Sequence, residues 1–479
     1  MLELLKPERV FYYFEEISKI PHGSGNTKAI SDYCVAFAKE HGLSYIQDSW
    51  NNIILMKEAS KGREQDDGII LQGHLDMVTV KDEDCDIDFS KDALRLKVDG
   101  DEIYAEGTSL GGDDGIAVAY ALAVLEDDSL SHPHLEVVLT VDEEIGLLGA
   151  AGIDLSMLKG QYLINLDSEE EGVFLTSCAG GLRGDMVIPV RYLEEEGILY
   201  QIKVTGLTGG HSGSEIDKER ANAIKLTGRL LLELEQKISY GICKLQGGEK
   251  DNAIAAECAF SLLVKAEDAG QFEQLLQERM AVYQAEYACS DPNLRIEWRK
   301  RDSRIEKRID LSCQKNVVYL LANLPNGVQN WSRIIPGLVE TSLNLGIVLL
   351  DQEKLTVTAS VRSSVGSRKE ALSNQLRSMT EFLGGEYTTR GEYPAWEYRA
   401  DSKLRETAVE IYREKYKKEP LVQAIHAGLE CGILLEKCPR LDAISFGPDI
   451  KDIHTTRERL SISSVARVWE YLVEVLEKL

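Results

Sequence analysis

The sequence predicts an α/β domain of layered helices and strands, split in the chain by an inserted α+β domain. Two observations support this expectation. Up to residue 183, and again from residue 396, helical segments alternate with buried strand-like runs, as they do in layered α/β domains. Between these parts, strands and helices follow one another without regular alternation. We therefore expect residues 1–183 and 396–479 to form the α/β domain and residues 184–395 to form the insertion.

Length and composition limit the classes of protein that fit this chain. With 479 residues it is too long for one ordinary core, and 43% hydrophobic and 28% charged residues are typical of soluble globular proteins. The net charge of -26 argues against nucleic acid or an anionic membrane as a partner. The chain has no long apolar run and no basic, apolar leader, and its nine cysteines include no CxxC pair. We expect a cytoplasmic protein with reduced thiols.

The first part of the α/β domain is expected to contain both strands and helices. Helix is expected over residues 5–42, interrupted at 21–25, and over 116–126, whereas the acidic stretch 81–102 is expected to be irregular. Buried strands are expected at 51–56, 68–73, 135–141 and 162–166. The second part is expected to begin with a helix at 404–416 and to continue with a strand at 421–426, a helix at 428–438, a strand at 443–447 and a final helix from 463.

The insertion is expected to begin with two antiparallel strands, 186–189 and 200–204, around a Glu-rich turn. Further strands are expected at 253–264, 343–349 and 355–360, and helices at 221–236, 269–286 and 367–383. Because these elements do not alternate regularly, they indicate a separate α+β domain.

Polar side chains follow several of the expected strands. His74 and Asp76 follow one strand, three consecutive acids (142–144) follow another, and Asp167 follows a third. In α/β sheets, ligands bind at the carboxyl ends of the strands. Acids gathered there are costly unless something positive meets them, so we hypothesise that Glu143 and Glu144 face a bound metal.

Two further residues fit the same hypothesis. Asp113 lies in a glycine-bracketed loop that can bend around an ion, and His454 lies late in the chain. Each motif alone is weak evidence, because a single histidine is usually structural and an Asp-Glu-Glu run is usually a solvated turn. The evidence is their joint occurrence, in order, after strand-like segments.

These motifs resemble peptidase family M20, a group of zinc-dependent metallopeptidases. The matching segments are 73–76, 111–115, 142–146, 165–169 and His454. Within the family, segments 108–111, 207–213 and 425–432 look most similar to the aminoacyl-histidine dipeptidases. The resemblance implies that the split α/β domain is a zinc-peptidase catalytic domain and that the insertion is a lid.

The resemblance also implies a metal centre with two Zn²⁺ ions per subunit, Co²⁺ or Mn²⁺ being alternative metals. His74 and Asp167 would bind one ion, Glu144 and His454 would bind the other, and Asp113 would bridge them. Two zinc ions polarise a scissile carbonyl and lower the pKa of water.

Two neighbouring residues would have supporting roles by the same resemblance. Asp76 would orient His74, and Glu143 would be the general base. The family loop often has a single aspartate where this chain has Asp113 and Asp114, and the spacing favours Asp113 as the bridge.

Three residues of the insertion match substrate contacts of the family. His211 would stabilise the oxyanion, Arg362 would hold the substrate carboxylate, and Asn252 would be a further contact. The sequence leaves other roles open: His211 could cap the following helix, Arg362 could be a surface strand residue, and Asn252 could be a turn residue. Residues 255 and 256 are alanines where the family commonly has Pro-Arg, which removes a positive charge near the substrate.

The expected function is zinc-dependent hydrolysis of unblocked dipeptides, with C-terminal histidine as one option for the substrate. The expected partners are a small peptide substrate and a second copy of the chain in a homodimer, with neither nucleic acid nor membrane. Alternative functions are those of a tripeptidase, an N-acyl amino acid deacylase or a non-catalytic peptide-binding homologue.

Overall fold

The computed structural model describes residue 2 and residues 4–479. The chain divides into two compact units. Unit 1 comprises residues 1–178, 398–424 and 429–479, and unit 2 comprises residues 179–397 and 425–428. Residues 425–428 were expected in the α/β domain, as were residues 179–183 and 396–397, whereas their contacts group all three segments with unit 2.

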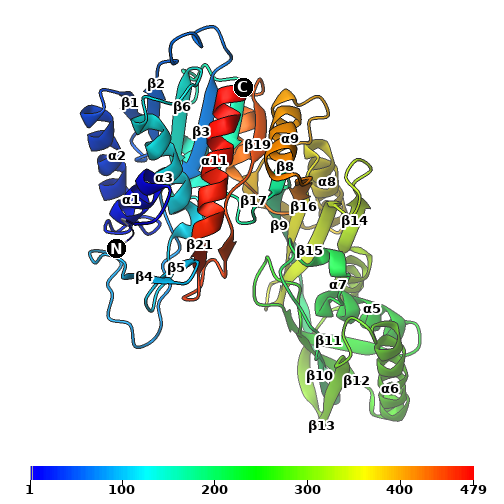
Figure 1. Ribbon diagram of the computed structural model, residues 1–479. Coiled ribbons are helices and arrows are strands. Elements are labelled where there is room, and N and C mark those ends of the chain that lie inside the picture. The colour runs from blue at the N-terminus through cyan, green and yellow to red at the C-terminus, as the bar shows by residue number, and fades with distance from the viewer. Residues whose placement is uncertain (1, 3) are drawn as a thin grey trace. The chain divides into compact units, whose positions relative to one another are not determined.

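Unit 1 is built on an eight-stranded sheet with the strand order β1-β2-β6-β3-β7-β19-β8-β18 (Figure 1). The central strands β6, β3, β7 and β19 run parallel, and β2 pairs antiparallel with both β1 and β6. The strands are β1 (Ser44–Gln47), β2 (Ile53–Lys57), β3 (Ile69–His74), β6 (Leu135–Thr140), β7 (Tyr162–Asn165), β8 (Val173–Cys178), β18 (Leu421–Ile425) and β19 (Asp442–Ser445).

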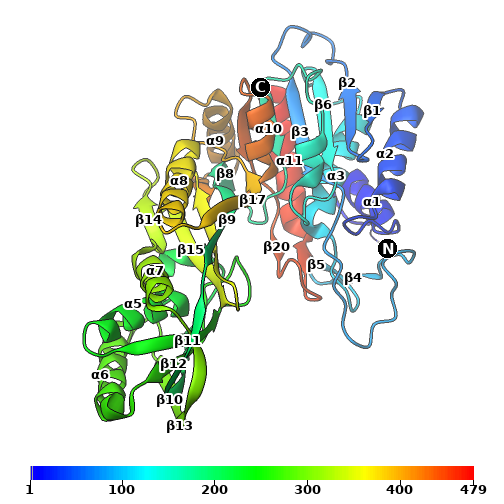
Figure 2. The same cartoon turned by 180° about the vertical axis from the view of Figure 1, so that it is seen from behind.

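Helices cover both faces of this sheet. Helix α11 lies in front of the sheet in Figure 1, and α10 lies in front of it in the opposite view of Figure 2. Every residue of β3 and β6 is buried, as expected for parallel strands covered on both sides. The helices are α1 (Glu8–Ile17), α2 (Lys28–Glu40), α3 (Gly112–Glu126), α4 (Leu148–Gly152), α9 (Lys403–Tyr416), α10 (Glu430–Lys437) and α11 (Ile462–Lys478).

Helix α3 is buried on all sides and packs against both α1 and β3. All of its residues from Gly115 to Leu125 are buried, because this stretch is apolar around the whole helix rather than on one face. Asp113 lies in the first turn of α3. The packing of this helix in the core therefore fixes the position of the loop that carries Asp113.

A small four-stranded sheet, in the order β20-β21-β5-β4, completes unit 1. Its strands are β4 (Leu96–Asp99), β5 (Glu102–Ala105), β20 (Ile450–Lys451) and β21 (Arg459–Ser461). β4 lies within the stretch expected to be irregular, so that prediction is wrong for these four residues. Because β21 pairs with β5, the turn containing His454 lies beside the chain that leads into Asp113.

Unit 2 contains a nine-stranded antiparallel sheet in the order β13-β10-β12-β11-β15-β16-β9-β17, with β14 paired to β15. Its strands are β9 (Gly180–Pro189), β10 (Tyr192–Thr205), β11 (Tyr240–Gly247), β12 (Cys258–Val264), β13 (Arg295–Ile309), β14 (Gly327–Trp331), β15 (Val339–Leu350), β16 (Lys354–Ser363) and β17 (Glu386–Tyr393). Its α-helices are α5 (Ala223–Glu235), α6 (Ala269–Glu286), α7 (Leu311–Asn323) and α8 (Gly366–Phe382). Helices and strands share one hydrophobic core.

The expected Glu-rich turn of unit 2 is instead part of strand β10. Residues 194–196 pair with β13, and the Arg308 Nε atom lies 2.5 Å from a carboxylate oxygen of Glu195. The basic residues of β13 compensate the acids across the ladder. This pairing is non-local, so it overrides the local preference of consecutive glutamates for a turn.

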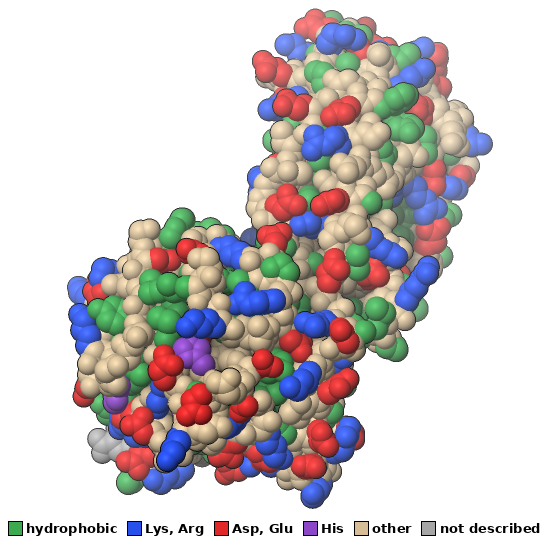
Figure 3. Space-filling model, turned by 90° about the horizontal axis from the view of Figure 1, so that it is seen from above, with side chains coloured by type: hydrophobic (Ala, Val, Ile, Leu, Met, Phe, Trp, Pro, Cys, Tyr) green, Lys and Arg blue, Asp and Glu red, His purple; other side chains and the backbone are tan. Residues whose placement is uncertain are grey.

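The net charge of -26 is not gathered into one block on the face shown in Figure 3, where acidic and basic side chains are interspersed. Within residues 2 and 4–479, no helix combines the length and the apolar character needed to cross a bilayer.

Candidate metal centre and substrate-contact residues

The polar residues of unit 1 meet because three of their strands are parallel neighbours. β3 lies between β6 and β7 and runs parallel to both. His74 is the last residue of β3, Glu143 and Glu144 follow β6, and Asp167 follows β7. The carboxyl ends of parallel strands open at the same edge of the sheet, so these side chains converge there.

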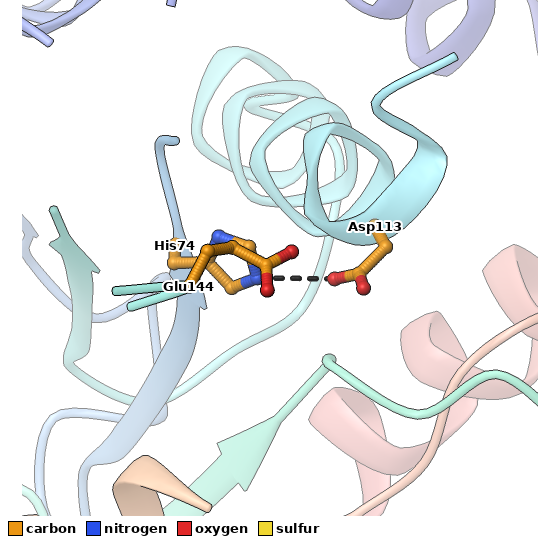
Figure 4. A group of neighbouring side chains, drawn as sticks. All are labelled: His74, Asp113 and Glu144. Carbon is orange, nitrogen blue, oxygen red and sulfur yellow. Dashed lines mark hydrogen bonds and ion pairs between the residues drawn. The ribbon is translucent and has the colours of Figure 1, made fainter. Parts of the chain in front are cut away.

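The side chains of the five expected metal ligands form one network. The two carboxylate oxygens of Asp113 lie 3.0 Å from His74 Nε2 and 3.1 Å from His454 Nε2. His454 Nε2 lies 2.8 Å from Glu144 Oε1, and Asp167 Oδ1 lies 3.8 Å from His74 Nε2. Figure 4 shows His74 and Asp113 facing each other beside Glu144, and ligand atoms of these three residues lie within 4.8 Å of one another.

Asp113 and Asp114 have different surroundings. Asp113 lies between the two histidines, whereas Asp114 Oδ2 accepts a hydrogen bond of 3.1 Å from the backbone N–H of His74. Ligand atoms of His74, Asp114 and Asp167 also lie within 4.8 Å of one another. Both aspartates therefore belong to the site, and only Asp113 contacts His74 and His454 together.

Asp76 is buried and links His74 to the acidic loop. Its Oδ1 atom lies 3.5 Å from His74 Nδ1, which also lies 2.9 Å from the backbone carbonyl of Asp76. The Asp76 carboxylate also accepts hydrogen bonds from the backbone N–H groups of Glu143 (3.0 Å) and Glu144 (3.4 Å) and from the Ser24 hydroxyl (2.7 Å). Asp76 therefore positions the acidic loop as well as the His74 ring.

Glu143 differs from Glu144 in its partners. Within the described residues, the Glu143 carboxylate has no hydrogen-bond or ion-pair partner, whereas Glu144 contacts His454. In the metal-free protein, burial raises the pKa of Glu143 to about 8, with the charge of His74 opposing this and the charge of Glu430 adding to it. A carboxylate with these properties is suited to accept and release a proton.

His454 occupies a strained position in the turn between β20 and β21. Its backbone lies in the left-handed region, with φ of 59°, which residues other than glycine adopt rarely. In the metal-free protein, hydrogen bonds to Asp113 and then Glu144 raise the pKa of His454 to about 10. The two carboxylates thus hold the imidazole in this conformation.

Two buried glutamates of the site were not singled out as site residues by the sequence. Glu430 is fully buried, and its Oε2 accepts hydrogen bonds from Gln72 Nε2 (2.6 Å) and the Thr140 hydroxyl (2.5 Å). Burial raises its pKa to about 7. Glu458 accepts hydrogen bonds from the backbone of the Asp113 loop. Glu430 is a single acid in an otherwise apolar run (429–435), within the segment 425–432 that matches the family, whereas Glu458 lies in polar sequence. For Glu458, the only sequence signal of a close neighbour is the pair of glycines before Asp113.

In unit 2, His211 and Asn252 lie on paired segments. His211 forms a β-bridge with Ala253, and the N–H of Ser212 donates to the Asn252 carbonyl at 2.8 Å. The backbone N–H groups of residues 213 and 214 donate to His211 Nδ1, both at 3.3 Å. In a neutral ring with an accepting Nδ1, the proton is on Nε2, which can then donate to a substrate oxygen. Within the described residues, the Asn252 side chain has no hydrogen-bond partner.

Arg362 is a buried arginine without an acidic partner among the described residues. It lies on β16, its Nη1 donates to the Tyr393 hydroxyl at 3.0 Å, and its buried Nε atom has no partner. Burial, and then the charge of Arg362, lower the pKa of His211. Arg362 is therefore close to His211, and it is not the surface residue that the sequence left as an alternative.

Comparison with known proteins identifies relatives over the whole chain. The sequence pattern of peptidase family M20/M25/M40 matches residues 70–478. The chain is 35% identical to the cytosol non-specific dipeptidase of Escherichia coli (strain K12), over 100% of this chain and 99% of that protein. It matches the crystal structure of aminoacylhistidine dipeptidase from Vibrio alginolyticus with a TM-score of 0.95 and 34% identity, covering 100% of this chain and 98% of that one.

A more distant structure shares the fold alone. Aminopeptidase PepT from Bacillus cereus is 15% identical and matches with a TM-score of 0.57 over 99% of this chain and 98% of that one. The expected α/β fold and the resemblance to the M20 family are thus confirmed. The chain belongs to peptidase family M20/M25/M40 and is a peptide hydrolase.

Proposed function

We propose that this enzyme is a dinuclear zinc dipeptidase that hydrolyses the peptide bond of unblocked dipeptides. The full-length similarity to proteins named as a cytosol non-specific dipeptidase and an aminoacylhistidine dipeptidase supports the substrate class. The observation that carries the metal centre is the position of Asp113, with one oxygen 3.0 Å from His74 and the other 3.1 Å from His454. A carboxylate in that position has an oxygen available for each of two cations.

The residues of the site fit zinc by their chemistry. Imidazole nitrogens and carboxylate oxygens are the ligands that zinc accepts besides thiolates. Asp114 is buried, and the side chains of Asp113 and Asp167 are only 9% and 11% exposed. These three carboxyl groups lie close to only two imidazoles, so the site has an excess of potential negative charge. Burial raises the pKa values of Asp114 and Asp167 well above their usual range. Divalent cations would remove this unfavourable burial of charge.

The proposed ligands divide into two sets around Asp113. His74 and Asp167 would hold one zinc ion, Glu144 and His454 would hold the second, and Asp113 would bridge them. Asp76 would keep His74 in the required orientation through its contact with Nδ1. Co²⁺ and Mn²⁺ are alternative metals, because the same nitrogen and oxygen ligands accept them.

In the proposed reaction, Glu143 moves the proton. When bound, two zinc ions polarise the scissile carbonyl and lower the pKa of water. Glu143 would take a proton from the attacking water and deliver it to the nitrogen of the leaving amine. The backbone of Glu143 is held by Asp76, while its carboxylate has no competing partner among the described residues.

The unit 2 residues would recognise the substrate. His211 would donate its Nε2 proton to the carbonyl oxygen as negative charge develops there. Arg362 would bind the terminal carboxylate of the dipeptide, since a buried guanidinium gains from an anionic partner. Asn252 would provide a further polar contact, because its side-chain amide is unpaired within the described part of the chain.

We also propose that the protein is cytoplasmic and forms a homodimer. Its ligand would be a small peptide substrate, and it would bind neither nucleic acid nor membrane. The name of the Escherichia coli relative includes the word cytosol, which supports the location. The net charge of -26 is unfavourable for binding nucleic acid or an anionic membrane surface.

Turnover of a small substrate panel tests the proposed function. Zinc-loaded enzyme is expected to cleave alanyl-histidine and other free dipeptides, and to leave a tripeptide and an N-acetyl amino acid largely intact. Comparing alanyl-histidine with alanyl-leucine measures the preference for C-terminal histidine. Cleavage of the tripeptide alone, or of the acetylated substrate alone, would replace the dipeptidase proposal with tripeptidase or deacylase activity. Peptide binding without any turnover would indicate a non-catalytic homologue.

A further inference from the structure

We propose that Glu458 is a positioning residue of the metal centre, a role that rests on the proposed dinuclear site. Its carboxylate holds the loop of Asp113 and the turn of His454 together. These two segments are distant in sequence, and each supplies a proposed ligand. Glu458 would thereby set the geometry in which Asp113 bridges the two ions.

The carboxylate of Glu458 accepts four consecutive backbone N–H groups. Oε2 accepts from Leu110 at 2.8 Å and from Gly111 at 3.2 Å. Oε1 accepts from Gly112 at 2.8 Å and from Asp113 at 3.3 Å. The side chain is almost completely buried, with 3% of its surface exposed. Successive N–H groups that converge in this way form a concave anion site, which is here filled by a side chain of the same chain.

The two glycines of this loop permit the backbone path around the carboxylate for different reasons, Gly111 through its positive φ and Gly112 through its closeness to Glu458. Gly111 adopts φ of +68°, which a residue with a Cβ atom adopts rarely, and a Cβ there would lie 2.8 Å from Met77 Sδ. A Cβ on Gly112 would lie 3.1 Å from Glu458 Oε1. The glycines let the backbone wrap around the carboxylate, so the sequence before Asp113 is adapted to Glu458.

The effect on the metal centre follows from two connections. The N–H of Asp113 is held by Glu458, while the carboxylate of Asp113 contacts both His74 and His454. Glu458 also lies four residues after His454, and its N–H donates to the Thr455 carbonyl in the same turn. A shift of Glu458 would therefore displace Asp113 relative to His454, and bridging requires both to stay in place.

The test is the zinc affinity of Glu458→Gln, measured on metal-free protein by competition with a chromophoric chelator. The amide keeps the shape of the side chain but replaces one accepting oxygen with an N–H₂ group that faces two N–H donors. Zinc affinity is expected to fall by about 10–100-fold, the usual effect of losing a residue that orients metal ligands. The variant Glu458→Asp keeps the charge on a shorter side chain, and it is expected to show a smaller loss.

Glu136→Gln is the matched control. Glu136 is also buried, with 1% of its surface exposed, and lies at the start of β6, opposite the end that leads to Glu143. Its carboxylate accepts hydrogen bonds from the backbone N–H groups of Lys159 and Gly160. This variant is expected to lose stability while retaining wild-type zinc affinity, which separates a structural effect from positioning. Near-ultraviolet circular dichroism establishes that each variant is folded.

The outcomes distinguish this inference from the proposed function. Wild-type affinity in Glu458→Gln, or an equal loss in Glu136→Gln, would overturn the role of Glu458 and leave the metal centre in place. If Glu458→Gln does not fold, wild-type affinity in folded Glu458→Asp would overturn it in the same way. A wild-type protein that binds no zinc would contradict both proposals.

Discussion

The two candidate regions of the molecule differ in the sign of the charge that each leaves uncompensated. In unit 1, buried carboxyl groups outnumber the two imidazoles of His74 and His454. In unit 2, the buried guanidinium of Arg362 has no acidic partner within the described residues. From this difference we infer that the unit 1 region would receive cations and that Arg362 in unit 2 would receive an anion.

Neither arrangement is favourable for the isolated protein. Burying a charge without a partner costs several kcal/mol or shifts the pKa of the group until it becomes neutral. The acids of unit 1 respond in the second way, since burial raises the pKa of Asp114 and Asp167. An arginine cannot respond in this way, because its guanidinium stays protonated at all relevant pH values. Zinc ions and a peptide carboxylate would relieve these costs in their respective regions.

The largest expected effect separates Glu143 from its neighbour Glu144. Glu143→Gln should bind two zinc ions and lose about 10²–10⁴-fold in kcat, because only the proton transfer is removed. Glu144→Gln should lose zinc, since it alters a proposed ligand. Metal content and turnover of alanyl-histidine measure both effects. Loss of zinc from Glu143→Gln, with retention in Glu144→Gln, would reverse the two assignments.

The next effect concerns Arg362, which we propose binds the terminal carboxylate of the substrate. Arg362→Ala should lower kcat/KM for a free dipeptide by about 10²-fold, corresponding to ~3 kcal/mol for losing a buried charged partner. With the corresponding dipeptide amide, which has no terminal carboxylate, the variant and the wild type should differ much less. Arg368→Ala is the control, because Arg368 already pairs with Glu340 at 2.7 Å. An equal loss of kcat/KM on the dipeptide and on its amide would contradict a contact between Arg362 and the terminal carboxylate.

The smallest expected effect concerns the stability of unit 2 in acid. His426 is buried, and its Nε2 lies 2.7 Å from the Ser342 hydroxyl. Burial, and then the charge of Arg362, lower the pKa of His426 from 6.5 to about 3. Below pH 6.5 His426 is protonated in the unfolded form but stays neutral in the folded form. The free energy of unfolding therefore falls as the pH drops from 6.5 toward 3.

His426→Gln should remove this part of the pH dependence. Between pH 7 and pH 5, the wild type should lose about 2 kcal/mol more free energy of unfolding than the variant, following 1.36 kcal/mol per pH unit below 6.5. Urea unfolding at the two pH values measures the difference. An identical pH dependence in both proteins would show that His426 is not held neutral beside Arg362.

The sequence was sufficient to predict the structural features that depend on strong local patterns. The strands that end near His74 and Asp167 are apolar runs, and their parallel pairing follows from the alternation of helices and strands. The sequence alone therefore predicts that residues at the ends of such strands lie at one edge of the sheet. The contact of Asp113 with both histidines could not be obtained this way, because it depends on two segments far apart in the chain.

The features that the sequence did not predict depend on non-local pairing. Glu458 lies between two arginines in a polar stretch typical of a solvated turn, and only the folded loop of Asp113 gives its carboxylate four donors. The acids of β10 indicate a turn in the sequence, and only their pairing with the basic strand β13 shows that they belong to a strand. Likewise, residues 425–428 follow an α/β pattern in sequence, although their contacts are with unit 2.

The zinc content of the purified protein decides whether Asp113 organises a centre of two metal ions. Inductively coupled plasma mass spectrometry should give two zinc ions per wild-type chain after loading and removal of free metal. Asp113→Asn should lose at least one ion. Asp114→Asn should keep two, because an amide oxygen can still accept the N–H of His74. One ion or none in the wild type, or loss from Asp114→Asn with retention in Asp113→Asn, would contradict the account.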